Sequence, residues 1–221
     1  MERDELIASM PKGVCRASQL PRYRESSASG VEAAEGIPRE GKLFEAGGEA
    51  GAGVIELVGN ARLSAAVRWT VAAQGRGEAV VWVSGREEGF YPPDLKSNGV
   101  DLDSLPVILV YRREDCIEAI DTLMRSGFFS LVVVDWSDSW SLEGALQTRF
   151  FRLGRNHGVT LLFLAEERTT EGIALVPLRI RATRRREAPG AYLIDLEIIR
   201  DKRGVRMSRQ EEAACGPPGL R

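Results

Sequence analysis

Short apolar runs alternate with segments of helical periodicity through the middle of the chain. The runs cover residues 54–58, 80–83, 107–110, 131–134 and 160–164. They are mostly continuous rather than alternating, which is typical of strands covered on both faces. Helical spacing is seen over residues 63–74, 114–126 and 142–156. This order of strands and helices predicts an α/β fold whose sheet is mostly parallel, with helices on both faces.

The two ends of the chain follow different patterns. Strands expected at about residues 173–182 and 191–200 flank Ala188-Pro189-Gly190, which predicts a C-terminal antiparallel hairpin that extends the sheet. Residues 1–50 have little periodicity and are expected to form a partly irregular N-terminal arm, which lies across the core or reaches a partner. Residues 207–221 end in Gly216-Pro217-Pro218-Gly219 and are expected to be a flexible tail. Residues 51–206 are therefore predicted to form a single core domain.

Composition narrows the class of protein. The chain has 221 residues, of which 43% are hydrophobic and 28% charged, as in ordinary globular proteins. No apolar run approaches the roughly 18–20 residues of a membrane span, so we expect a cytoplasmic protein that does not contact the membrane. Three widely spaced cysteines and a single histidine give no metal-site or disulfide pattern. The net charge of −2 gives the whole molecule no strong attraction for polyanions.

A degenerate phosphate loop follows the first core strand. A functional loop reads G-x-x-x-x-G-K-[ST] between a strand and a helix, with lysine on the outer phosphates and the hydroxyl on magnesium. Aligned on Gly59, the window is Gly59-Asn60-Ala61-Arg62-Leu63-Ser64-Ala65-Ala66. Ser64 replaces glycine, Ala65 replaces lysine and Ala66 replaces the magnesium ligand. Each lost charge-assisted contact costs about 10- to 150-fold in affinity, so no nucleotide cofactor is expected, although Arg62 remains a candidate phosphate contact.

Carboxylates stand where an ATPase would keep catalytic groups. Asp135 directly follows the apolar run 131–134, which is the position of a Walker-B aspartate. Glu87 comes after the strand expected at 80–83. Without the lysine, these carboxylates would repel a triphosphate. We therefore interpret them as inherited geometry and expect no catalytic activity.

These residues carry a resemblance to a known superfamily. The span from about Gly53 to Gly204 resembles the RecA/ImuA/SulA superfamily and, within it, the ImuA branch. Counting back without gaps from the most RecA-like stretch, residues 99–105, Glu87 falls where RecA keeps its catalytic glutamate. The matching segments are Gly53-Val54-Ile55-Glu56-Leu57-Val58-Gly59, Asn98-Gly99-Val100-Asp101-Leu102-Asp103-Ser104-Leu105, Ser126-Gly127 with Leu131-Val132-Val133-Val134-Asp135, Thr160-Leu161-Leu162-Phe163-Leu164 and Arg200-Asp201-Lys202-Arg203-Gly204.

The resemblance implies a RecA-like core and a non-catalytic accessory role in SOS-induced mutagenesis and translesion DNA synthesis. The implied partners are RecA and ImuB, an inactive Y-family polymerase, with single-stranded DNA reached indirectly through RecA. The chain departs from RecA after Leu164, where Ala165-Glu166-Glu167 replaces the polar amide that senses the γ-phosphate. The segments that would form RecA-type DNA-binding loops are also short.

Two alternatives stay open: a SulA-like inhibitor of cell division, and a RecA-type DNA-dependent ATPase with an altered phosphate loop. The surface that would contact a partner or DNA is expected in the arginine-rich C-terminal region, with a solvated strand face as the plainer interpretation. Its residues are Arg179, Arg181, Arg184, Arg185 and Arg186.

Overall fold

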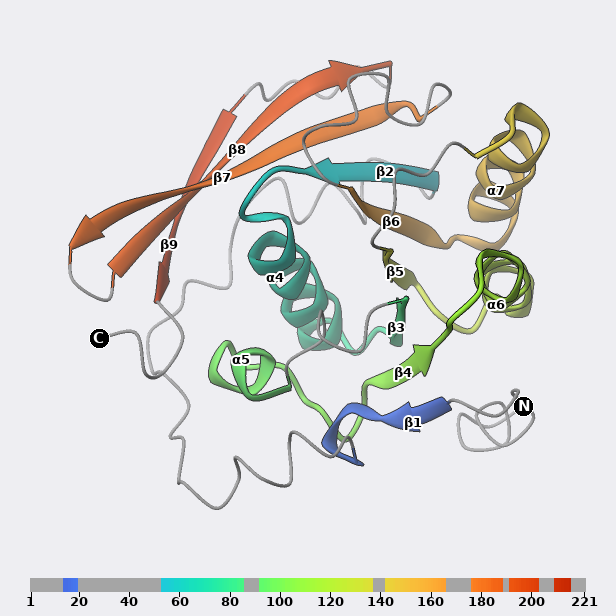
Figure 1. Ribbon diagram of the computed structural model, residues 1–221, viewed down its shortest axis with the longest axis horizontal. Helices are drawn as coiled ribbons and strands as arrows, with labels where there is room; N and C mark the ends of the chain where they lie inside the picture. The colour runs from blue at the N-terminus through green and yellow to red at the C-terminus, as the bar shows by residue number, and fades with distance from the viewer. Residues whose placement is uncertain are drawn as a thin grey trace.

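The computed structural model describes residues 14–19, 53–85, 92–136, 142–165, 176–188, 191–202 and 209–215. Within these residues a single nine-stranded sheet runs in the order β1-β4-β3-β5-β6-β2-β7-β8-β9 (Figure 1). The strands are β1 (Val14–Arg16), β2 (Gly53–Val58), β3 (Val80–Ser84), β4 (Pro106–Leu109), β5 (Leu131–Asp135), β6 (Thr160–Ala165), β7 (Leu178–Ala188), β8 (Ala191–Asp201) and β9 (Arg209–Cys215). The helices are α4 (Arg62–Gly75), α5 (Pro92–Ser97), α6 (Arg113–Ser126) and α7 (Gly144–His157), with a 3-10 turn at Ala17–Gln19.

The predicted fold class is confirmed. Strands β4, β3, β5, β6, β2 and β7 run parallel to one another. Strands β1, β8 and β9 pair antiparallel, so β7 and β8 form the expected C-terminal hairpin. Helices α4 and α5 lie on one face of the sheet and α6 and α7 on the other (Figure 1).

Each face of the sheet carries its own core. Ile55, Leu57, Trp69 and Trp82 belong to the core under α4 and α5. On the opposite face, Ile120 of α6 and Phe150 of α7 pack on the sheet. Because alternate residues of β2 point to opposite faces, Glu56 points to the α6 and α7 side.

Local sequence sets where the two outer helices begin and end. Glu114 and Asp115 lie in the first turn of α6, where the helix dipole favours negative charge. Gly127 ends α6 and Gly158 ends α7, both in the left-handed conformation that glycine adopts without strain. His157 is the last residue of α7, one residue beyond the end of the predicted helical spacing.

The sheet is larger than the pattern predicted at both ends. Arg209–Cys215, placed in the flexible tail by the sequence, form β9 along the outer edge of β8. Val14–Arg16, within the predicted N-terminal arm, form β1 against β4. Neither segment has the apolar pattern of a core strand. An edge strand does not need one, since backbone pairing with a single neighbour is enough to form it. The part of the chain that the structure describes contains no helix long and apolar enough to cross a membrane.

Candidate functional site: a closed phosphate loop and an arginine-rich hairpin

The connection from β2 to α4 is too short to cradle a phosphate. Strand β2 ends at Val58 and α4 begins at Arg62, so Gly59, Asn60 and Ala61 alone connect them. A functional phosphate loop places six residues between its strand and its lysine, and their amides converge on the phosphate. Here the residues at those later positions are already helical. The connection is therefore a tight turn.

The turn is held against β7 by hydrogen bonds and by a close backbone contact. The Ala61 amide donates a hydrogen bond to the Ala182 carbonyl at 3.1 Å. The Arg184 amide donates to Asn60 Oδ1 at 2.9 Å. Gly59 has φ +101°, and a Cβ built on it would lie 2.2 Å from the Ala182 carbonyl oxygen. These contacts hold the turn closely against the backbone of β7.

The positions of the lost lysine and hydroxyl face the protein interior. Ala65 and Ala66 are both fully buried, at 0% exposure, in the core under α4. A longer side chain at either position would enter this core rather than reach a ligand. Arg62, the remaining candidate phosphate contact, donates from Nη1 to the Gly59 carbonyl at 3.3 Å. Its guanidinium therefore stabilises the turn through this hydrogen bond.

The Walker-B position is also packed. Asp135 ends β5 and is 2% exposed, in register with the buried Ser84 of β3. The Gly85 amide donates to the Asp135 carbonyl at 2.9 Å. A Cβ on Gly85 would lie 2.1 Å from the ring of Trp136, so that ring covers this edge of the sheet closely. Glu87 lies outside the described residues. Among those described, no group of three or more His, Cys, Asp or Glu side chains could hold a metal ion.

The five arginines expected on one surface lie in three different environments. Arg179 is buried, and its Nε lies 3.2 Å from Oε2 of the buried Glu56 on β2, so it is not part of any exposed surface. Arg181 forms an ion pair with Glu197 of β8 at 3.0 Å. Arg184, Arg185 and Arg186 are exposed on the outer part of β7, beyond the end of β2.

The outer part of the hairpin also brings in a residue that the sequence analysis missed. Tyr192 of β8 is in register with Arg186, and its ring centroid lies 4.9 Å from the guanidinium carbon of Arg184. Pairing back from the predicted turn at residues 188–190 would have placed residue 192 opposite the arginine run. Similarly, a lone glutamate in the apolar strand β2 was a signal of a buried basic partner.

Comparison with known proteins supports the architecture. No protein-family model matches the chain, and no curated protein matches its sequence. Among solved structures, the crystal structure of the RadB recombinase is similar, with a TM-score of 0.54 and 15% sequence identity over 74% of this chain and 87% of that one. The fold is RecA-like. At this identity the likeness concerns the fold alone, and the expected membership of the ImuA branch stays a prediction.

Proposed function

We propose that this chain is a non-catalytic RecA-like accessory protein of SOS-induced mutagenesis and translesion DNA synthesis, which acts by binding RecA and ImuB. The observation that carries the proposal is the closed turn at Gly59–Ala61. With Ala182 bonded to this turn and Ala65 and Ala66 buried, the RecA-like fold has no seat for a triphosphate. A RecA-like chain without that seat cannot act through ATP turnover, which favours a role in binding partners.

The RecA-like fold suits a partner of the same family. RecA protomers pack against one another through a segment ahead of the core, whereas here residues 14–19, which precede the core, pack on the chain's own sheet. Val14–Arg16 pair with β4, and Ala17 is fully buried in the core under α4. A chain that presents a protomer-like face without ATP turnover can cap or modulate a RecA filament. ImuB is the second partner because the sequence resembles the ImuA branch.

The decisive experiment measures partner binding and nucleotide binding on the same purified chain. Nuclease-treated pull-downs against RecA and against ImuB should each retain the chain. Calorimetric titration with ATP and magnesium should give no binding at millimolar nucleotide. Micromolar ATP binding with hydrolysis that Asp135→Asn abolishes would instead establish the altered ATPase. Binding to the division protein FtsZ, without binding to RecA or ImuB, would establish the SulA-like alternative.

A further inference from the structure

The outer part of the β7–β8 hairpin separates its charges between two faces. On one face, Arg181 pairs with Glu197, and Asp195 lies in register with Thr183. On the other face, the strands place Ala182, Arg184 and Arg186 from β7 and Tyr192, Ile194 and Leu196 from β8. Between Ala182 and Arg186 neither β7 nor β8 places an acidic residue on this second face, and on the outer strand β9 Glu212 is in register with Ile194. The part of this face formed by Arg184, Arg186 and Tyr192 is called the arginine–tyrosine face below.

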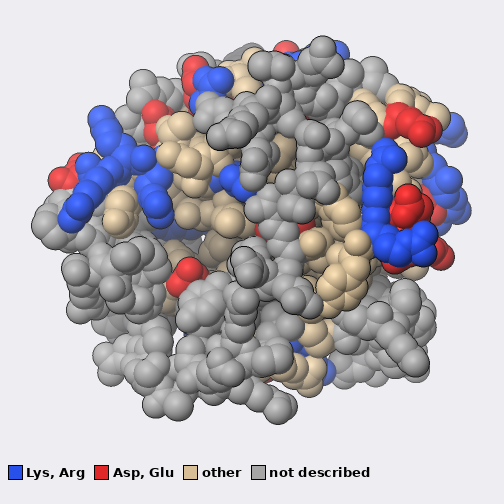
Figure 2. Space-filling model, viewed as in Figure 1, with Lys and Arg blue, Asp and Glu red and all other residues tan. Residues whose placement is uncertain are grey.

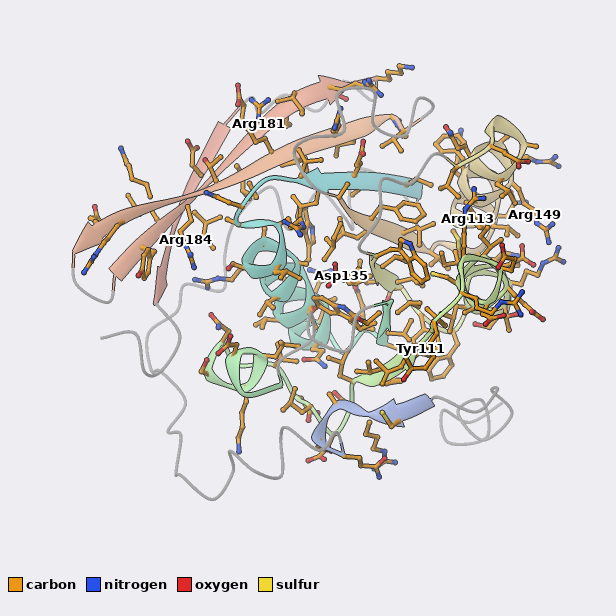
Figure 3. The ribbon with its side chains drawn as sticks, in the orientation of Figure 1. Tyr111, Arg113, Asp135, Arg149, Arg181 and Arg184 are labelled. Carbon is orange, nitrogen blue, oxygen red and sulfur yellow. The ribbon has the colours of Figure 1, made fainter. Side chains whose placement is uncertain are left out.

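The cations of this face are available. Arg184 and Arg186 are exposed, and among the described residues neither guanidinium has an ion-pair partner. Figure 3 shows Arg184 on the side of the hairpin that faces α4, and Figure 2 shows basic side chains gathered where the hairpin projects from the body. Because alternate residues of a strand are about 6.7 Å apart, the two guanidiniums can contact successive negative groups of an extended polymer.

The aromatic ring decides the chemistry of that polymer. Tyr192 is partly exposed, and Arg184 lies against its ring with the guanidinium carbon 4.9 Å from the centroid. An acidic peptide would bind through the arginines alone and would make no use of the tyrosine ring. A single-stranded nucleic acid uses both features, since its phosphates pair with arginine and its unpaired bases stack on tyrosine or on a guanidinium plane. A duplex keeps its bases stacked and would leave the ring unused.

We propose that the arginine–tyrosine face binds single-stranded nucleic acid directly, with Arg184 and Arg186 on the phosphates and Tyr192 stacked on a base. The closed turn supports this face, because Asn60 accepts a hydrogen bond from the Arg184 amide. With two phosphate contacts on a chain of net charge −2, the binding is weak and local. This contact goes beyond the proposed function, in which single-stranded DNA is reached through RecA.

The test is fluorescence anisotropy of the isolated full chain with labelled 20-nucleotide oligothymidine at low salt. The Arg184→Gln/Arg186→Gln variant should lose at least about tenfold in affinity. Arg152→Gln, which removes an exposed arginine from α7, should change affinity by less than about twofold. Tyr192→Ala should lose about fivefold or more, whereas Tyr192→Phe should bind nearly as well as the native chain. The slope of log affinity against log salt should be about −1.4 and should approach zero in the double variant.

Three results would overturn the proposal. The native chain could fail to bind the oligonucleotide at low salt, or the double variant could bind as tightly as the native chain. Polyglutamate could displace the oligonucleotide as efficiently as unlabelled oligothymidine, which would make the face a site for acidic proteins. Because no RecA or ImuB is present, and the pull-downs are nuclease-treated, failure here is distinguishable from failure of the proposed function.

Discussion

Glu56 on β2 and Arg179 on β7 form an ion pair inside the protein. The two residues are in register across the parallel strands, Nε lies 3.2 Å from Oε2, and the side chains are 1% and 8% exposed. Removing one partner leaves a buried charge without its counter-charge. Arg179→Met should therefore lower the free energy of unfolding by about 3–5 kcal/mol, measured by urea denaturation.

Two further variants separate this effect from a general loss of contacts. Glu56→Met/Arg179→Met should recover most of the lost stability, because a buried pair replaced by apolar side chains is often close to neutral. Arg181→Met removes the neighbouring ion pair with Glu197, whose side chains are 37% and 53% exposed, and should cost less than about 1 kcal/mol. If Arg179→Met were no more destabilising than Arg181→Met, the buried pair would not stabilise the sheet.

The elements that the sequence predicts well are those with strong local signals. The apolar runs that became β3 and β5, and the periodic helix ended by Gly127, depend on residues close in the chain. The closed turn does not, because the contact between Gly59 and Ala182 exists only once β7 lies beside β2. Likewise β9 follows from backbone pairing with β8 and has no apolar pattern of its own. The burial of Arg179 was missed because strand alternation gives the face of a side chain but not the neighbouring strand.

Gly59 should tolerate no side chain. Its φ of +101° is unfavourable for other residues, and a Cβ would lie 2.2 Å from the Ala182 carbonyl oxygen, which is backbone and cannot turn aside. Gly59→Ala should therefore cost about 3 kcal/mol or more and lower Tm by about 6 °C or more in thermal denaturation.

Gly77 provides the matched control for that substitution. It also has a positive φ, +77°, but a Cβ there would meet nothing within 4 Å. Gly77→Ala should cost only the backbone strain of about 1–2 kcal/mol. Equal losses for the two variants would show that the contact between the turn and β7 does not restrict Gly59.

Restoring the motif residues should not restore nucleotide binding. Ala65→Lys/Ala66→Thr returns the phosphate-binding side chains to a turn that is closed and to positions at 0% exposure. A buried lysine without a partner is costly, so we expect a loss of about 4 kcal/mol or more and no rise in Tm with magnesium and ATP. Ser64→Lys, which adds the same charge at a half-buried position one residue earlier, should be much milder. Stabilisation of the double variant by magnesium and ATP would contradict the closed turn.

Cys116 should be unreactive until the protein unfolds. It is a fully buried residue of α6, and burial raises the pKa of its thiol from 9.0 to about 12. At pH 8 the thiolate is about one part in ten thousand, and the thiolate is the reactive form. In a Cys15→Ser/Cys215→Ser background, a disulfide reagent should therefore modify Cys116 only as fast as the chain unfolds.

The same raised pKa gives a pH dependence with a definite sign. Above about pH 9 the thiol loses its proton in the unfolded chain and keeps it in the folded chain. Deprotonation therefore stabilises the unfolded state, and the free energy of unfolding falls. Urea denaturation should show a loss of about 1.4 kcal/mol per pH unit between roughly pH 9 and 12 relative to Cys116→Ala, which lacks the titrating group. Parallel stability profiles for the two proteins, or rapid modification of the folded chain at pH 8, would place the thiol in contact with solvent.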